Sequence, residues 1–517
     1  MRSNMLYLCA WWIATLLLSA GRVIGGEASS DYLVRNLPGL PQHTKLTQYA
    51  GHVEINSKTN SNIFFWLFER LIKTEKDKLV IWLNGGPGCS SEDGVFLENG
   101  PFRIKPDLTL AINSGAWNKY ATVLFVDQPP GTGLSYADTN HYAKSIDEVV
   151  DKFMVFLDKF FDMFPKYKKS ELYITGESYA GIYIPYFTTE ILKRNKYNLQ
   201  AIAIGNPWMD PWHQYQAYYT FSVDKGLLKG EAKNEVKKIL DACMEKQQKE
   251  GIKIHTDSCE EILHKILNYS IIEEGNQKTC INEYDIRGRD TYPSCGMNWP
   301  FELANITKYL QRPDVLEAVH ATGKTAGWVE CAKLVSKNLK DDGSSPSVTL
   351  LSNILKHIPV MIYSGDQDLI CNHYGTDYMI ANLTWNGGVG MDSQPSPWYI
   401  NGKKAGTIQT SRNLTYAIVY DASHMVPYDK PDEMLDLINQ FMGIRAGAKV
   451  MTERLMERRR WEEQYDTVSL LIIAGSISAV VIMLWFLKAK KRVNQYKTAY
   501  ETEWLHPDIE KPILATK

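Results

Sequence analysis

The sequence predicts an α/β protein in which a mostly parallel sheet is covered by helices on both faces. Between about residues 45 and 205, apolar runs rich in β-branched and aromatic residues alternate with segments of helical periodicity. Strands of the same kind resume after about residue 348, and a long stretch without them lies between. Because parallel strands need crossover connections, usually helices, this alternation favours a parallel sheet interrupted by one insertion.

The predicted strands are short apolar runs bounded by turn residues, as buried strands are. In the first region the sequence predicts strands at 78–83, 120–127, 172–176 and 199–205, and helices at 145–161 and 183–194. In the second region it predicts strands at 357–365 and 414–422 and a closing amphipathic helix at 432–442.

The predicted core and its insertion differ in composition. The core occupies 27–207 and 348–445, and the insertion, a mainly helical cap, occupies 208–347. The insertion is rich in lysine and glutamate and holds five of the eight cysteines: Cys243, Cys259, Cys280, Cys295 and Cys331. Disulfides are therefore expected to staple it.

Both ends of the chain carry predicted targeting segments. Residues 1–26 place Arg2 before an apolar run and small residues, the pattern of a cleaved secretory signal peptide. Residues 468–487 form an apolar run without a charged residue. This run is long enough to cross a hydrocarbon core of about 30 Å as one transmembrane helix. A charged stalk at 446–467 precedes this run and a tail at 488–517 follows it. The signal peptide then predicts a lumenal body and a cytosolic tail.

Charge and glycosylation motifs agree with a lumenal protein. The formal net charge is -2 and no long basic field occurs, so nothing in the sequence favours a nucleic-acid partner. Four N-glycosylation motifs precede the apolar run, at Asn268, Asn305, Asn382 and Asn413.

The stretch LYITGESYAG, residues 172–181, places Ser178 directly between a predicted strand and a predicted helix. A serine on such a sharp turn exposes its hydroxyl above the sheet, as a nucleophile requires. The usual motif has glycine two residues after the serine, where this chain has Ala180. A structural serine in a tight turn fits the same local pattern.

A nucleophilic serine needs a base and an orienting carboxylate, which in α/β-hydrolases follow later in the chain in the order acid, histidine. Asp368 follows the predicted strand 357–365, and His424 follows the predicted strand 414–422. His357 precedes its strand and His373 lies only five residues from Asp368, so both fit the base poorly. The pattern by itself leaves Asp366 as a rival acid.

The glycine-rich segment WLNGGPGCSS, residues 82–91, follows the predicted strand 78–83. Gly85 and Gly86 offer unhindered backbone N–H groups, which could act with the N–H of Tyr179 as an oxyanion hole. The segment lacks the lysine and spacing of a phosphate-binding loop.

Five separated motifs, GESYAG, WLNGGPGCSS, VDQPPGTGLSY, SGDQDLICN and SHMVPYDKP, resemble the serine carboxypeptidase family over nearly the whole lumenal chain. The resemblance implies an α/β-hydrolase fold with an inserted domain, and a triad of Ser178, Asp368 and His424. It also implies that the enzyme needs no cofactor and no metal.

The resemblance also implies roles for the residues around the triad. Gly86 and Tyr179 would supply the oxyanion donors. Asn84 and Glu177 would hold the free C-terminal carboxylate of the substrate, with Glu98 in the same network. If Glu177 and the C-terminal carboxyl group of the substrate were both ionised, they would repel each other, so one of the two must carry a proton. Substrate binding should therefore weaken above mildly acidic pH. A solvated turn residue is the alternative interpretation of Glu177.

The cysteines and the acidic pocket complete the expectations. The resemblance implies a Cys89–Cys331 disulfide, and local pairing of Cys243 with Cys259 and of Cys280 with Cys295 is the economical arrangement of the rest. Cys371 is then the free thiol, either near the substrate or buried and inert. Asp93 lies where the family binds the last substrate residue, so it would attract a C-terminal lysine or arginine. An acid favoured by a helix N-terminus fits the same position.

The apolar run at 468–487 makes the chain resemble the fungal, membrane-anchored, pheromone-processing members of the family. That resemblance implies peptide and proprotein substrates with basic C-termini and a trans-Golgi membrane location. It also implies cytosolic sorting factors that bind the tail, where Tyr496 and Tyr500 are candidates for the sorting signal. Three alternatives remain open at this stage: broad or hydrophobic specificity, an esterase or lipase, and an inactive membrane-anchored binding protein.

Overall fold

The computed structural model describes residues 30–444 together with residues 483, 487, 488 and 490. The chain divides into two compact units, Met1–Ile444 and Arg445–Lys517, which are treated separately. The predicted signal peptide and stalk, and most of the apolar run 468–487 and of the tail 488–517, lie outside the described residues. Among the residues that are described, no helix is long and apolar enough to cross a membrane.

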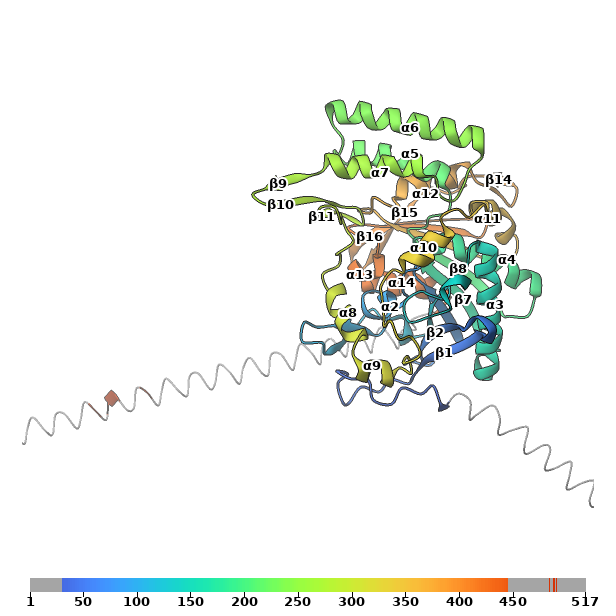
Figure 1. Cartoon of the computed structure of the whole chain (residues 1–517), viewed down its shortest axis with the longest axis vertical. Coiled ribbons are helices and arrows are strands. Elements are labelled where there is room, and N and C mark those ends of the chain that lie inside the picture. The colour runs from blue at the N-terminus through green and yellow to red at the C-terminus, as the bar shows by residue number, and fades with distance from the viewer. Residues whose placement is uncertain (1–29, 445–482, 484–486, 489, 491–517) are drawn as a thin grey trace, which may run out of the picture. The chain divides into compact units, whose positions relative to one another are not determined.

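A ten-stranded sheet forms the centre of the first unit, in the order β1-β2-β6-β3-β7-β8-β12-β17-β16-β15 (Figure 1). The six strands from β6 to β17 in this order run parallel, and the pairs at either end are antiparallel. The parallel strands are β3 (Lys78–Leu83), β6 (Thr122–Asp127), β7 (Glu171–Glu177), β8 (Leu199–Gly205), β12 (Val360–Gly365) and β17 (Leu414–Val419). The antiparallel strands are β1 (Gln48–Asn56), β2 (Ser61–Phe68), β15 (Ser396–Ile400) and β16 (Lys403–Ser411).

The central strands are buried along their whole length, as β3, β6 and β12 illustrate. Strands covered on both faces read as continuous apolar runs, which explains why sequence patterning predicts them. The edge strands β15 and β16 mix exposed and buried positions, and the sequence pattern did not predict them. The hairpin β1–β2 was also missed, although β2 is fully buried.

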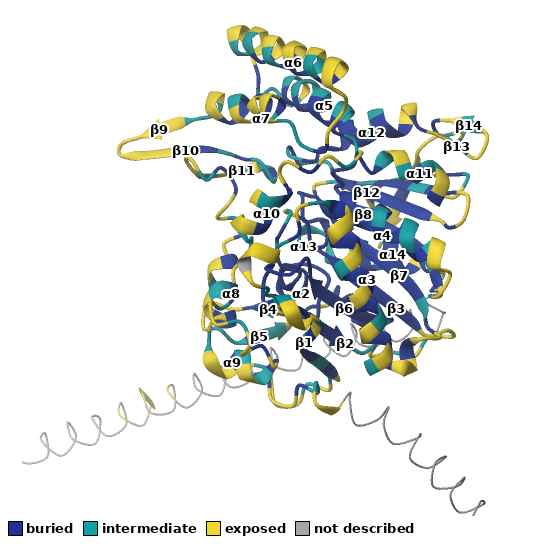
Figure 2. Cartoon of the chain, turned by 45° about the vertical axis from the view of Figure 1, so that its right-hand side comes forward, coloured by how far each residue is buried: buried dark blue, intermediate teal, exposed yellow. Residues whose placement is uncertain are grey.

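Helices cover both faces of the sheet (Figure 2). The longest of them over the parallel region is α3 (Ile146–Met163), which begins where the Ser145 side chain accepts a hydrogen bond from the backbone N–H of Glu148. Phe153 of α3 stacks on Phe187 of the neighbouring helix with ring centroids 4.0 Å apart. The other helices of the core are α2 (Glu92–Phe96), α4 (Ala180–Arg194), α11 (Val348–Ile354), α12 (His373–Asn382), α13 (Val426–Asp429) and α14 (Pro431–Phe441).

The segment between β8 and β12 forms the predicted insertion and is mainly helical. Its helices are α5 (Pro211–Asp224), α6 (Gly230–Glu250), α7 (Asp257–Tyr269), α8 (Leu303–Leu310), α9 (Pro313–Ala318) and α10 (Lys333–Leu339). It also contains a three-stranded sheet that the sequence did not predict: β9 (Ile272–Glu274), β10 (Gln277–Asn282) and β11 (Asp285–Thr291). In Figure 1, α5, α6 and α7 lie together at one end of the molecule.

Small elements complete the unit. Two short two-stranded sheets are formed by β4 (Phe102–Ile104) with β5 (Leu110–Ile112), and by β13 (Thr384–Trp385) with β14 (Gly388–Val389). Single 3₁₀ turns lie at Ser57–Thr59, Trp117–Lys119, Thr139–His141 and Pro165–Tyr167.

Candidate active site

Ser178 lies on the turn between β7 and α4 with a φ of 61°, a left-handed conformation that is strained for a residue with a side chain. Backbone hydrogen bonds hold this turn: the Ser178 N–H donates to the Gly205 carbonyl (3.0 Å), and the Ser178 carbonyl accepts from Gly181 and Trp208 (both 2.9 Å). The turn is therefore rigid and presents the serine at the carboxyl end of a central strand.

Asp368 and His424 follow β12 and β17, which are adjacent parallel strands, so both side chains emerge at the same edge of the sheet. His424 Nδ1 lies 2.8 Å from Asp368 Oδ2, and both residues are buried. Asp366, the rival acid, instead accepts a hydrogen bond from the side chain of Gln367 (3.1 Å). The structure thus brings His424 together with Asp368.

Asn206 is a site residue that the sequence analysis missed. Its Nδ2 donates to Asp368 Oδ2 at 2.7 Å, and its Oδ1 accepts from the N–H of Gly365 at 3.2 Å. The residue follows β8, the strand between those that carry the serine and the aspartate. That position after a strand was the available signal, because side chains at the carboxyl ends of parallel strands converge.

Ser178 and His424 line one pocket of about 110 Å³ at this sheet edge. Cys371 lies beside them: its sulfur, a carboxylate oxygen of Asp368 and a ring nitrogen of His424 are all within 4.8 Å of one another. Burial and the charge of Asp368 raise the pKa of the Cys371 thiol well above its usual range, while contact with Ser178 lowers it slightly.

The backbone N–H groups of Gly86 and Tyr179 belong to two loops that pack against each other beside the nucleophile. A Cβ built on Gly85 would lie 2.4 Å from the Tyr179 nitrogen and 2.8 Å from Ser178 Cβ, so the glycine loop packs directly against the nucleophile turn. Gly86 has a φ of +105°, which residues with side chains rarely adopt. Within the described part of the chain, neither the Gly86 nor the Tyr179 N–H donates to another protein group. Both are available to a ligand oxygen.

Asn84 lines the pocket and joins two buried carboxyl groups. Its Nδ2 donates to Glu98 Oε1 at 2.9 Å and to Glu177 Oε1 at 3.1 Å, and its own Oδ1 accepts from the indole of Trp82 at 2.7 Å. Both amide hydrogens of Asn84 are therefore already used. A substrate carboxylate can bind Asn84 only by exchanging one of these bonds.

Both carboxyl groups have raised pKa values, which favours one proton on the pair. The Oε2 atoms of Glu98 and Glu177 are buried and have no conventional donor, which is the arrangement of two acids that face each other. Burial raises the pKa of Glu177 well above its usual range, and the charge of Glu98 and the hydrogen bond to it raise it further. Burial also raises the pKa of Glu98, although hydrogen bonds from Glu177 and Asn84 lower it. Glu177 is therefore the protonated member of the pair.

A second pair of acids lines the same pocket. Asp93, in α2, is 6% exposed, and its Oδ1 has no hydrogen-bond partner. Burial raises its pKa well above the usual range, and the charge of Glu330 adds to this effect. Glu330, which the sequence analysis did not single out, has its pKa raised to about 7 by burial. Its position next to Cys331 was the available signal.

Among the described residues there are three disulfides, Cys89–Cys331, Cys243–Cys259 and Cys280–Cys295, which are the pairings expected from the sequence. Cys371 is a free, buried cysteine. The first disulfide connects the glycine loop to the segment that carries Glu330, across 242 residues of sequence. It therefore fixes the inserted segment against the pocket.

The four glycosylation motifs lie on accessible parts of the unit. Asn268, Asn382 and Asn413 are exposed, and Asn305 is half-buried. The side-chain nitrogens of Asn382 and Asn413 donate to the backbone carbonyls of Tyr378 (2.8 Å) and Leu355 (3.1 Å). Attachment of a glycan at either position would alter these bonds.

The sequence profile described as serine carboxypeptidase matches residues 38–443. The chain belongs to the serine carboxypeptidase family. It is a serine-type carboxypeptidase, an enzyme that hydrolyses peptide bonds at the C-terminus of its substrates. This assignment replaces two of the alternatives left open by the sequence, an esterase or lipase and an inactive binding protein.

Similar proteins place the enzyme within the family. It is 45% identical to the pheromone-processing carboxypeptidase KEX1 of Pyricularia oryzae over 83% of this chain and 71% of the relative. The pheromone-processing carboxypeptidase KEX1 of Chaetomium globosum is 44% identical over 84% of this chain and 69% of the relative. The crystal structure of KEX1(Δ)P, a prohormone-processing carboxypeptidase from Saccharomyces cerevisiae, matches with a TM-score of 0.75 and 34% identity, covering 80% of this chain and 96% of that one.

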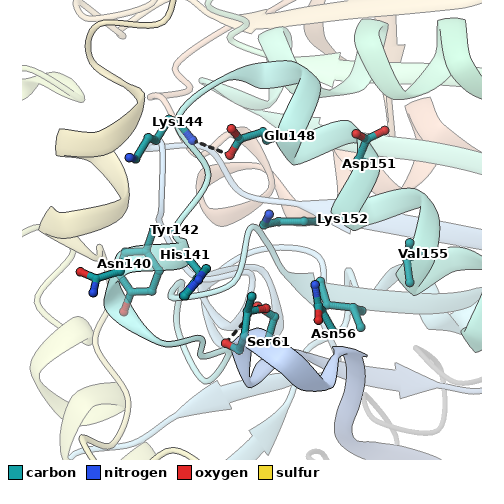
Figure 3. Close-up of a pocket in the computed structure, with 12 residues that line it drawn as sticks. Asn56, Ser61, Asn140, His141, Tyr142, Lys144, Glu148, Asp151, Lys152 and Val155 are labelled. Carbon is teal, nitrogen blue, oxygen red and sulfur yellow. Dashed lines mark hydrogen bonds between the residues drawn. The ribbon is translucent and has the colours of Figure 1, made fainter.

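A separate hollow of about 400 Å³ lies between the β1–β2 hairpin and the start of α3 (Figure 3). Its walls carry side chains of both charges, among them Lys152, Glu148 and Asp151. The Glu148 carboxylate already accepts a hydrogen bond from the backbone N–H of Lys144 at 3.1 Å. No residue of the triad or of the carboxyl pairs lines this hollow, so it contributes nothing to the active site.

Proposed function

We propose that the enzyme removes C-terminal lysine and arginine residues from peptides and proproteins after endoproteolytic cleavage. One observation carries this proposal: the pocket lined by Ser178 and Glu177 is also lined by Asp93, a buried carboxyl group whose Oδ1 has no hydrogen-bond partner among the described residues. The names of the relatives, pheromone-processing and prohormone-processing carboxypeptidases, support the same conclusion.

The geometry supports a two-step acyl transfer. Ser178 Oγ attacks the carbonyl carbon of the last peptide bond while His424 takes the hydroxyl proton, and Asp368 stabilises the imidazolium that forms. The N–H groups of Gly86 and Tyr179 stabilise the oxyanion. His424 then gives the proton to the leaving amino acid, and a water molecule hydrolyses the acyl-enzyme by the same route.

The carboxyl pair explains why the substrate must end in a free acid. Glu177 carries the shared proton and can donate it in a hydrogen bond to the substrate carboxylate, which a bare pair of anions would repel. An amide-blocked terminus offers no anion to accept this bond. Exopeptidase activity therefore depends on Glu177 and Glu98 as well as on the triad.

The test compares peptides that differ only in their last residue, which is lysine, arginine, leucine or phenylalanine. We expect the highest kcat/KM for lysine and arginine, and no turnover of the same peptides with an amidated C-terminus. The variant Ser178→Ala should lose both turnover and labelling by a fluorophosphonate probe. Equal kcat/KM for all four peptides would refute the basic preference, and cleavage of the amidated peptides would refute the role of the carboxyl pair.

We also propose that the enzyme is a single-pass protein of the trans-Golgi network membrane with a lumenal catalytic unit. The signal-like residues 1–26, the uncharged run 468–487, the disulfides and the accessible glycosylation motifs support this location. Glycosidase treatment should increase the electrophoretic mobility of the protein, and protease added to intact vesicles should remove only the tail at 488–517. Loss of the catalytic unit under the same conditions would contradict this orientation.

A further inference from the structure

The acidic pair in the pocket has no cation of its own. Within the described part of the chain, no lysine or arginine forms an ion pair with either Asp93 or Glu330. Arg103, whose charge acts on Glu98, directs its guanidinium to the backbone carbonyls of Glu98 and Phe102 at 2.7 and 3.0 Å. Buried carboxyl groups are normally paired, so an unpaired set that lines a ligand pocket indicates that the ligand supplies the partner.

Glu330 is fixed in place by the same loop that forms the oxyanion hole. Its carbonyl accepts from the N–H of Ser90 at 2.8 Å, and the next residue, Cys331, is bonded to Cys89. On the other side, the indole of Trp328 donates to Ser90 Oγ at 2.8 Å. The backbone of Glu330 is therefore tied to the glycine loop, its half-buried side chain lines the pocket, and Asp93 is more deeply buried.

The remaining wall of the pocket suits the stem of a long basic side chain. Tyr284 and Trp299 both line it, with their rings nearly parallel and the centroids 6.3 Å apart. Lysine and arginine bury their methylene stems along such apolar surfaces and keep the charged end near polar groups. Aromatic faces also attract the cation itself.

We propose that Glu330 is a specificity-determining residue that acts with Asp93 as a two-carboxyl receptor for the terminal lysine or arginine side chain. This inference rests on the proposed function and assigns its basic preference mainly to Glu330. Burial keeps a proton on Asp93 in the free enzyme, and when the incoming ammonium or guanidinium group binds, this proton passes to solvent.

The proposed receptor, Asp93 with Glu330, and the carboxyl pair, Glu98 with Glu177, affect substrate binding in opposite ways as the pH rises. The groups whose charges act on Asp93 are Glu330, Glu98 and Asp127, and all three disfavour its ionisation. Glu330 ionises as the pH rises through about 7, so its attraction for a basic side chain increases there. The carboxyl pair loses its shared proton as the pH rises, which weakens binding of every substrate. The ratio of kcat/KM for lysine to that for leucine should therefore increase with pH although both values fall.

The test measures this ratio in the wild-type enzyme and in Glu330→Gln, Asp93→Asn and Glu302→Gln. The last variant is the matched control, because Glu302 lies outside the pocket lining and contacts the hydroxyl of Tyr428. Titration with a fluorophosphonate probe normalises each preparation to its folded, active fraction. We expect Glu330→Gln to lower the ratio by about 10- to 100-fold, the range for loss of one charge-assisted hydrogen bond, and to flatten its rise near neutral pH. Glu302→Gln should leave the ratio unchanged.

Three results would overturn the inference. One is a wild-type ratio in Glu330→Gln, another is an equal loss for lysine and leucine substrates, and the third is an equal fall of the ratio in Glu302→Gln. A wild-type enzyme that does not distinguish lysine from leucine would instead refute the proposed function. The charge reversal Glu330→Lys provides a second readout, because it should shift the preference toward peptides that end in glutamate or aspartate.

Discussion

Replacing Glu177 by glutamine tests the shared proton directly. Glutamine keeps the shape of the side chain, can still accept the hydrogen bond from Asn84, and cannot ionise. In the proposed mechanism, one proton on the Glu98 and Glu177 pair is donated to the substrate carboxylate, as the raised pKa of Glu177 favours. Above the pKa of that proton, each pH unit costs about 1.4 kcal/mol, so kcat/KM should fall about tenfold per pH unit.

The variant should behave differently at the two ends of the pH range. At acidic pH, loss of the stronger hydrogen bond should cost about 1 kcal/mol, close to a fivefold lower kcat/KM. At alkaline pH the variant should overtake the wild type, because its amide still donates a hydrogen bond when the carboxyl pair has lost its proton. The ratio of variant to wild type should therefore rise by up to about tenfold per pH unit.

The assay measures kcat/KM from about pH 5 to pH 9 for a peptide that ends in leucine, which avoids the acidic pair. Dividing the variant values by the wild-type values removes the titration of His424, which both enzymes share. The rate of labelling by a fluorophosphonate probe, which has no carboxylate, serves as the control and should give the same ratio at every pH. A ratio that is independent of pH for the free-acid peptide would refute the shared-proton mechanism.

The same carboxyl pair predicts the pH dependence of stability. The pKa of Glu177 is raised in the folded state, so its contribution is fully present below the ordinary pKa of 4.5 and is lost as the pH rises through the folded value. The midpoint of thermal unfolding of the wild type should fall toward alkaline pH, and that of Glu177→Gln should fall less. Parallel curves for the two proteins would contradict this expectation.

Three further substitutions probe the surroundings of the triad. Asn206→Ala removes the donor to Asp368 and should lower kcat by about tenfold with little change in KM, because the acid loses the bond that orients it; a change in KM alone would contradict this. Gly85→Ala would place a Cβ 2.4 Å from the Tyr179 nitrogen, so fluorophosphonate labelling should be lost even if the protein is secreted in folded form. Cys331→Ala opens a disulfide that spans 242 residues, so it should lower the free energy of unfolding by up to about 5 kcal/mol and weaken the preference for lysine, as chemical denaturation and the peptide comparison would measure.

The sequence by itself determined the central strands, the nucleophile and the family. Strands buried on both faces, such as β3 and β7, must be continuously apolar, and a serine between a strand and a helix leaves a local pattern that is readable in one dimension. The order of Ser178, Asp368 and His424 followed from the same rule. The edge strands and the β9–β11 sheet left no such signal, because their residues are partly exposed and need no continuous apolar run.

Only the tertiary structure decided which residues meet in the site. Asn206 contacts Asp368 because β8 lies beside β12 in the sheet, and Glu330 reaches the pocket because a disulfide fixes the segment that carries it. The shared proton also depends on the fold, since a carboxyl group keeps a proton at neutral pH only where burial and a second acid oppose its ionisation. The spacing of residues in the sequence shows neither how deeply a carboxyl group is buried nor which second acid lies beside it. Both features arise only when distant segments pack together.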